Sequence, residues 1–267
     1  MQSLQFYRKA FTAQRPEGRL TTHSERYALA ALLSPLRLPL PWIFSLFGTD
    51  KQREGGHSYA AAYTDAFGPL RSKRIKLLEI GLLKGASLLG WRAYFPRASI
   101  AGIDIMPKPE MTRGRVRVYQ GDQGSAADLD HVCANEAPFD IIIDDGSHFN
   151  RHQLFSFYRL FPHLKDGGIY VIEDVQTSYW RGPVRGADYD WDGYDPFEPE
   201  FKDTCVGQFL ELAKYLNHAE FLSTERVDPG HASLAKQIRR IAFEHNLIFV
   251  WKGPNVEVSN WLATAVQ

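Results

Sequence analysis

The sequence predicts an α/β fold: a doubly wound, mostly parallel seven-stranded sheet with a C-terminal antiparallel hairpin and an N-terminal helical extension. From residue 75 onward, short apolar runs alternate with segments of helical spacing, as in a parallel sheet covered on both faces. Several runs end in a glycine or an acid, at the edge where open α/β sheets bind ligands. The 267 residues, 44% of them hydrophobic, can bury one substantial core.

The expected elements follow a strand–helix–strand order. We expect strands at residues 75–79, 100–104, 116–120, 139–144 and 169–172. We expect helices at residues 57–67, 85–95, 126–134, 151–164 and 205–216. Asp166-Gly167-Gly168 is predicted to break the helix before the fifth strand, because glycine disfavours a helix interior. The apolar runs 239–243 and 247–251 flank three polar residues and predict a terminal hairpin.

The N-terminal region is predicted to differ from the rest of the chain. Residues 1–48 form the helical extension, which is expected to end in the proline-rich run 38–41, and residues 49–267 form the main domain. The apolar stretch 27–47 is interrupted by Arg37 and prolines, whereas a membrane-spanning helix needs about 20 apolar residues. We therefore expect no membrane span. The stretch packs on the domain or on a partner subunit, or it contacts a membrane surface through its aromatic residues.

Composition narrows the class of protein. Lys+Arg and Asp+Glu both number 31, so no global positive field is available to hold a phosphate backbone, and we expect no nucleic-acid partner. The two cysteines, Cys133 and Cys205, form no C-x-x-C pair, which argues against a disulfide framework or a thiolate zinc site. The first residues lack the continuous apolar core of a signal peptide, so the expected location is cytoplasmic.

The first strand leads into an E-x-G-x-x-x-G-x-S pattern. Glu79, Gly81, Gly85 and Ser87 are its fixed positions. Glycines allow a strand to turn at once into a helix and let a ligand approach the backbone. A dinucleotide loop would instead be spaced G-x-G-x-x-G, and the carboxylate of Glu79 would repel a pyrophosphate. The acid suits a cationic ligand, such as one with an ammonium and a sulfonium; the alternative is a plain tight turn.

Acids also end the second and third strands. Asp104 follows Gly102-Ile103, where a carboxylate can hold both hydroxyls of a ribose. Asp122 follows Gly121, where a carboxylate can accept from an adenine amino group. Either acid alone could be a solvated strand end. Three acidic strand ends in series favour a binding crevice.

The fourth and fifth strands end in further carboxylates. Because neighbouring parallel strands lie about 4.8 Å apart, Asp145, Glu173 and Asp174 are expected to converge on one ion. Such an all-oxygen set suits Mg²⁺, allows Mn²⁺ or Ca²⁺, and disfavours zinc. Asp144 is expected to face the cofactor or to cap a helix. The alternative for the whole set is helix capping.

His148 follows Asp145 by three residues, where the chain enters a helix. A lone histidine is commonly structural. Beside a metal, however, it could take the proton of a hydroxyl whose acidity the cation has increased, since imidazole titrates near neutral pH. His148 is therefore the preferred general base.

The motifs together resemble a known family. The order LEIG, GID, QGD, DIIIDDGSH and GGIYVIEDVQTSYW looks like class I, Rossmann-like S-adenosylmethionine-dependent methyltransferases. It is more narrowly similar to the metal-dependent macrolide sugar O-methyltransferases of antibiotic biosynthesis, over residues 50–262; catechol O-methyltransferases share the metal layout more distantly. The resemblance implies that residues 49–267 are a methyltransferase catalytic domain. It also implies a metal at Asp145, Glu173 and Asp174, with His148 as base.

Other residues are candidates for closing the site. Gln176, Tyr179 and Trp191 lie in or just before an aromatic and acidic segment that could bind sugar rings; the alternative is a solvated lid. His57 and Tyr63 are expected to close over the cofactor, although a packed aromatic helix would explain them equally well.

The predicted function is S-adenosylmethionine-dependent, Mg²⁺-dependent O-methylation of a sugar hydroxyl on a glycosylated natural product or saccharide. A small-molecule glycoside is the expected partner, and a homo-oligomer is the expected assembly. The alternatives are a catechol-type phenol acceptor, a cephalosporin-hydroxylase-like relative, a nucleotide-dependent oxidoreductase and a non-catalytic scaffold.

Overall fold

A computed structural model describes residues 22–52, 57–184, 189–223 and 225–259. The described residues fall into two compact units, one that ends at Ser147 and one that begins at His148, and each unit is described here by itself.

The first unit is built on four parallel strands. They are β1 (Lys76–Ile80), β2 (Ser99–Asp104), β3 (Val116–Gln120) and β4 (Phe139–Asp144), in the order β3-β2-β1-β4. Ile80 pairs with Ile103 on one side and with Asp144 on the other, so the carboxyl ends of these strands meet at one edge. Four of the five β1 residues are buried, as expected for an inner strand of a covered sheet.

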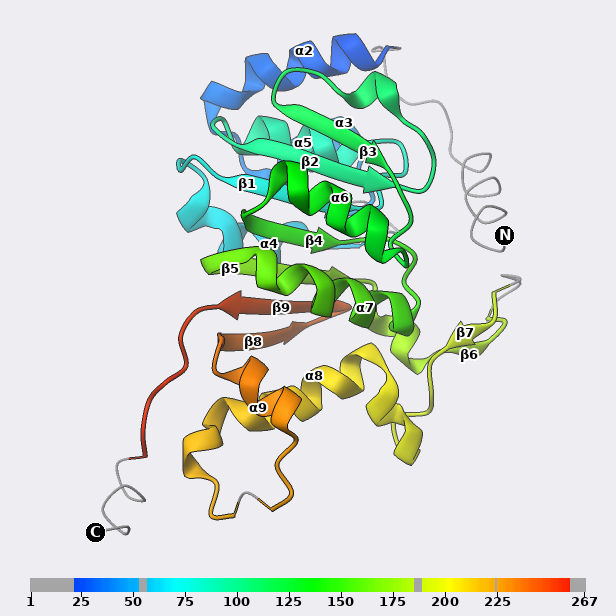
Figure 1. Cartoon of the computed structure of the whole chain (residues 1–267). Helices are drawn as coiled ribbons and strands as arrows, with labels where there is room; N and C mark the ends of the chain where they lie inside the picture. Colours follow the sequence, from blue (N-terminus) through cyan, green and yellow to red (C-terminus); the bar gives the residue numbers. More distant parts are fainter. Residues whose placement is uncertain (1–21, 53–56, 185–188, 224, 260–267) are drawn as a thin grey trace. The chain divides into compact units, whose positions relative to one another are not determined.

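Helices cover both faces of these strands (Figure 1). α5 (Ala86–Tyr94) connects β1 to β2, and α6 (Ala126–Glu136) connects β3 to β4. Because the two crossovers run in opposite directions along the strand order, right-handed connections place α5 and α6 on opposite faces. The hydroxyl of Ser125 caps α6 by accepting from the backbone N of Asp128.

The N-terminal segment consists of short helices. They are α2 (His23–Leu33), η1 (Ser34–Leu36), α3 (Leu40–Phe47), α4 (Ala60–Phe67) and η2 (Gly68–Leu70). Of these, α2, η1, α3 and α4 contact α5. Thr22 and Glu25 form a capping box at the start of α2. The prediction that the helical region ends at residues 38–41 is wrong: Pro39 is the N-cap of α3 and Pro41 lies in its first turn, where a missing N–H costs nothing.

An aromatic cluster joins α3, α4 and α5 in the core of this unit. Phe44, Tyr63 and Trp91 are fully buried. The Trp91 ring meets Phe44 edge-on at 4.8 Å between centroids and Tyr63 at 5.1 Å. Such pairs add to the free energy gained by burial, so the N-terminal helices are part of the core.

The second unit contains the remaining strands of the fold. β5 (Leu164–Glu173), β9 (Leu247–Lys252) and β8 (Ile238–Glu244) lie in the order β5-β9-β8, with antiparallel neighbours. The predicted terminal hairpin is thus confirmed. Gly167 and Gly168 lie inside β5, which begins earlier than expected. The other described elements are η3 (Pro109–Met111) in the first unit and, in the second, α7 (Asn150–Leu160), η4 (Phe161–His163), η5 (Val175–Tyr179), β6 (Arg181–Gly182), β7 (Trp191–Asp192), η6 (Pro199–Asp203), α8 (Cys205–Lys214), η7 (Tyr215–Glu220) and α9 (Pro229–Ala235).

The two units carry the seven strands of the predicted fold class, with the parallel set first in sequence and the antiparallel hairpin last. No helix within the described residues has the length and apolar character needed to cross a membrane.

Candidate active site

The turn after β1 can be built only with glycine. Gly81 has φ +80°, and a Cβ there would overlap the backbone oxygen of Asp145. Gly85 has φ +70°, and a Cβ there would collide with the side chain of Met111. Both positions therefore require glycine for backbone conformation and for space. The turn brings β1 directly into α5, so Glu79 and Ser87 come together.

Glu79 lies in a fully buried polar cluster at the foot of this turn. The hydroxyl of Ser87 donates to Glu79 Oε2 at 3.0 Å, and Lys51 Nζ lies 3.6 Å from Glu79 Oε1. Burial raises the pKa of Glu79 to about 7, against the opposing effect of the Lys51 ammonium. Lys51, which is 1% exposed, also donates to Asp145 Oδ2 at 2.5 Å. The buried ammonium of Lys51 thus forms ion pairs with two carboxylates, those of Glu79 and Asp145.

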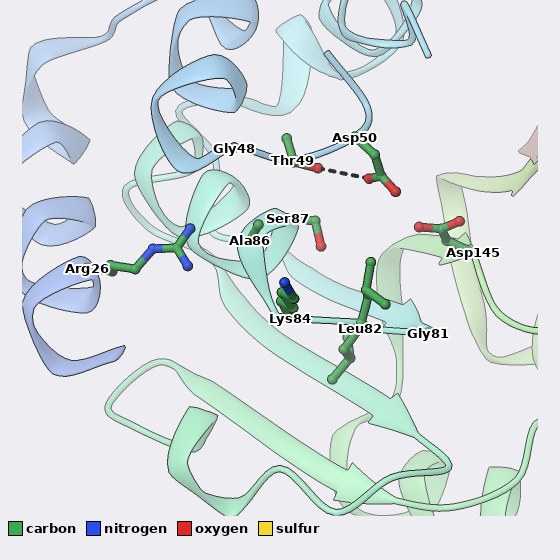
Figure 2. Close-up of a pocket in the computed structure, with 11 residues that line it drawn as sticks. Arg26, Gly48, Thr49, Asp50, Gly81, Leu82, Lys84, Ala86, Ser87 and Asp145 are labelled. Carbon is green, nitrogen blue, oxygen red and sulfur yellow. Dashed lines mark hydrogen bonds between the residues drawn. The ribbon is translucent and has the colours of Figure 1, made fainter. Parts of the chain in front are cut away.

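A pocket lies between residues 48–50 and the glycine turn (Figure 2), and it shares Ser87 and Asp145 with this cluster. Glycine-turn atoms of Gly81 and Leu82 line it, as do Ser87 and Asp145. Arg26 and Asp50 also reach its wall, so both signs of charge are available to a ligand. A molecule that carries an ammonium, a carboxylate and a sulfonium would meet complementary groups here.

The acids at the ends of β2 and β3 have different environments. Asp104 is buried and accepts from the backbone N of Leu82 and of Met106, each at 2.8 Å, so it fixes the glycine turn in place. Asp122 is exposed and accepts from the backbone N of Gly124 at 2.8 Å. Contact of either acid with a nucleoside stays a prediction.

Asp144 is held by a residue that the sequence did not single out. Gln123 Nε2 donates to Asp144 Oδ1 at 2.6 Å, and Gln123 Oε1 accepts from the backbone N of Ser147 at 2.9 Å. Gln123 therefore joins the loop after β3 to the loop after β4. Only its place beside Gly121-Asp122 could have drawn attention to it.

Two predicted site residues in the second unit have left-handed backbones. His148 has φ +59° and Asp174 has φ +56°. Positive φ is uncommon outside glycine and costs conformational energy that the surroundings must offset. His148 Nε2 lies 3.6 Å from Asp174 Oδ2, so the imidazole and this carboxylate share one environment. Glu173 is buried, and its carbonyl accepts from Gln153 Nε2 at 2.9 Å.

The candidate substrate residues belong to η5 and β7. Tyr179 is 47% exposed, whereas Trp191 is 8% exposed. Trp191 Nε1 and Gln176 Oε1 are buried atoms without a hydrogen-bond partner among the described residues. A buried donor or acceptor left unpaired is costly, so each is suited to pairing with a ligand.

His57 and Tyr63, which precede β1 in the chain and were expected to close over the cofactor, pack on other aromatic rings. His57 stacks on Tyr59 at 4.5 Å between centroids, and Tyr63 belongs to the fully buried cluster around Trp91. These contacts match the alternative of a packed aromatic helix. A role of either residue over the cofactor stays a prediction.

The predicted metal ligands come from both units. Asp145 belongs to the first unit and pairs with Lys51, whereas Glu173 and Asp174 belong to the second. Lys51 itself was not predicted as a site residue. It lies in the polar and aromatic stretch 49–70 before β1, where nothing in the local spacing indicates burial.

Searches with family models found no match. The chain is similar to characterised enzymes, however. It is 37% identical over 215 residues to mycinamicin VI 2''-O-methyltransferase from Micromonospora griseorubida, covering 77% of this chain and 51% of that protein. It is 37% identical to 8-demethyl-8-alpha-L-rhamnosyl tetracenomycin-C 2'-O-methyltransferase from Streptomyces olivaceus, covering 78% of this chain and 53% of that protein. The chain spans about half the length of these relatives.

A solved structure shares the fold. The MycE methyltransferase from the mycinamycin pathway, in complex with Mg, SAH and mycinamycin VI, matches with a TM-score of 0.73 and 32% identity. The match covers 96% of this chain and 72% of that one. The chain belongs to the class I methyltransferase family that includes the sugar O-methyltransferases of macrolide biosynthesis.

Proposed function

We propose that the protein transfers a methyl group from S-adenosylmethionine to a sugar hydroxyl, with Mg²⁺ as cofactor and Mn²⁺ as an alternative. The observation that carries the proposal is the pocket at the glycine turn, which Gly81 and Ser87 line, with Glu79 buried behind Ser87 and accepting from its hydroxyl. The MycE structure, whose match covers 96% of this chain, is described in complex with Mg, SAH and mycinamycin VI.

The pocket suits the cofactor's charged end. Buried Glu79 supplies an acceptor whose Oε1 has no hydrogen bond within the described residues. An ammonium or sulfonium placed near it would add to the stabilisation that the Lys51 ammonium and the Ser87 hydroxyl give this carboxylate. We assign Gly81, Gly85 and Ser87 to the wall of this site, Asp104 to the ribose side, and Asp122 and Asp144 to the adenine side.

We assign the metal to Asp145, Glu173 and Asp174. The support is the chemistry of three carboxylates, which matches the oxygen ligands that Mg²⁺ prefers, and the pairing of Asp145 with a cation in the described structure. When bound, Mg²⁺ would act as a Lewis acid that makes an acceptor hydroxyl easier to deprotonate.

We assign the proton transfer to His148. Its imidazole would take the hydroxyl proton while the oxygen attacks the sulfonium methyl in line, so that the C–S bond breaks and S-adenosylhomocysteine leaves. Asp174, 3.6 Å from His148 Nε2, would stabilise the protonated imidazole. Alignment of oxygen and methyl supplies much of the rate, since effective molarities of about 10⁵ M are reached in well-oriented pairs.

The acceptor we propose is a glycosylated natural product. One relative is named for O-methylation of a rhamnosyl tetracenomycin C, and another for O-methylation of mycinamicin VI. Gln176, Tyr179 and Trp191 would contact it, because two of them hold buried atoms that lack a partner in the described part of the chain. We also propose a homo-oligomer, by analogy with the family.

One experiment tests this function. The protein is incubated with methyl-labelled S-adenosylmethionine, Mg²⁺ and a panel consisting of mycinamicin VI, demethylmacrocin and 8-demethyl-8-rhamnosyl-tetracenomycin C, with catechol as a phenol control. We expect label in at least one glycoside and none in catechol. Label in catechol alone would assign the enzyme to phenols, and labelled product formed equally in EDTA would remove the metal.

A further inference from the structure

Helix α7 begins without a cap of its own. Its N-cap residue is Phe149, whose side chain makes no capping hydrogen bond. The cap comes instead from β7: the Asp192 carboxylate accepts from the backbone N of Asn150 at 2.9 Å and of Arg151 at 3.2 Å. An acid at this place satisfies free N–H groups and interacts well with the helix dipole.

Asn150 extends this contact into the interior of the second unit. It is 2% exposed, and its Nδ2 donates to Asp192 Oδ1 at 3.0 Å. Its Oδ1 accepts from Ser178 Oγ at 2.7 Å and from the backbone N of Cys205 at 2.8 Å. The start of α7 is thus fastened to η5, β7 and α8 at once.

The residue held just before this helix is His148. Its carbonyl accepts from Thr177 Oγ1 at 2.6 Å, and its backbone is left-handed. A left-handed histidine persists only where its surroundings fix it. Asp192 accepts from the backbone N–H groups of the first two residues of α7, directly after His148-Phe149. Loss of its carboxylate would therefore let the turn at His148 change its conformation.

Strands β6 and β7, with the described residues 181–184 and 189–192, form an arm that also carries aromatic rings. Trp191, next to Asp192, lies 5.3 Å from Phe149 and 5.4 Å from Tyr189 between ring centroids. Figure 1 shows β6 and β7 as a short hairpin of this unit. Asp192 is therefore the polar link between an aromatic arm and the turn of His148.

We propose that Asp192 is a positioning residue: it caps α7 from the β6–β7 arm and so fixes the turn that presents His148. The inference rests on the proposed function only in taking His148 as the base. It also couples the arm that we assign to the acceptor with the group that deprotonates the acceptor.

Hydrogen exchange on the full chain tests the positioning itself. In Asp192→Ala we expect exchange across residues 147–153 to rise about tenfold, the effect of a lost helix cap, with exchange in β1 and β9 unchanged. Asp192→Asn keeps an acceptor oxygen and should restore most of the protection. Asp190→Ala, which removes an exposed acid on the same arm, is the matched control and should change nothing. Unchanged exchange at 147–153 in Asp192→Ala, or a rise throughout the chain, overturns the proposal.

A double-mutant cycle tests the link to His148. With the glycoside that the labelling experiment identifies, Asp192→Ala should lower kcat about tenfold and leave KM for S-adenosylmethionine unchanged. In a His148→Ala background it should lower the residual rate no further, since it acts through His148. Additive losses would overturn the proposal. Wild-type turnover in His148→Ala, or the absence of methylation of every glycoside tested, would refute the proposed function instead. In that case the hydrogen-exchange result still decides whether Asp192 holds the turn at His148.

Discussion

Replacing Lys51 by methionine should destabilise the first unit in a pH-dependent manner. Lys51 is 1% exposed and Glu79 is 0% exposed, so the substitution leaves a buried carboxylate without its cation. Breaking a buried ion pair costs about 3–5 kcal/mol. We expect less than this at low pH, because Ser87 still donates to Glu79 and because Glu79 can take up a proton.

The direction in which the free energy of unfolding changes with pH follows from proton linkage. The pKa of Glu79 is raised to about 7 in the folded chain, so between its unfolded value and 7 the folded state binds more protons, and the free energy of unfolding falls as pH rises. Without Lys51 this pKa rises further, and the fall continues above pH 7. One group contributes at most about 1.4 kcal/mol per pH unit, which allows about 2 kcal/mol of extra loss between pH 7 and 8.5.

The assay is urea unfolding followed by circular dichroism between pH 5.5 and 8.5. The variants are wild type, Lys51→Met, the double variant Lys51→Met/Glu79→Gln, and Lys73→Met as an exposed-lysine control. We expect the destabilisation by Lys51→Met to grow with pH and the double variant to lose that growth. A destabilisation that is the same at pH 5.5 and 8.5 would refute the claim that Lys51 compensates Glu79.

Three further predictions concern the site. Gly81→Ala should lower the free energy of unfolding by about 2 kcal/mol or more and raise the Kd for S-adenosylhomocysteine, because φ is +80° and the Cβ has no space. Thermal melts measure the first effect and calorimetry the second. A melting temperature equal to that of the wild type would contradict the prediction. His148→Ala should lower kcat about 100-fold with the cofactor Kd unchanged, and an unchanged kcat would exclude it as base. EDTA should abolish turnover and Mg²⁺ should restore it, whereas Asp145→Ala should be inactive in excess Mg²⁺; an Asp145→Ala protein of wild-type activity would remove that ligand.

Much of the fold could be predicted because its elements are marked locally. The bounds of β3 and β4 match the expected 116–120 and 139–144, since apolar runs between turn residues define them. The end of the helical region at residues 38–41 was predicted wrongly, because proline fits the first turn of a helix. The glycines before the fifth strand were predicted to lie outside it, whereas Gly167 and Gly168 lie within β5; glycine weakens a strand but does not exclude one.

The local geometry of the candidate site was predictable at the end of β1. Glu79, Ser87 and the glycine turn come together because β1 runs straight into α5. Lys51, Gln123 and Asp192 were missed, because each acts on a partner far away in sequence: Lys51 on Asp145, and Asp192 on the start of α7. Long-range pairing leaves no periodic signal along the chain.

The central claim is that the pocket beside Glu79 binds S-adenosylmethionine, and calorimetric titration tests it most directly. We predict that S-adenosylhomocysteine binds the wild-type protein, that NAD does not, and that Glu79→Gln raises the Kd about tenfold, as expected when a charged hydrogen-bond acceptor is replaced by a neutral one. Binding of NAD, or equal affinity in Glu79→Gln, would contradict the account.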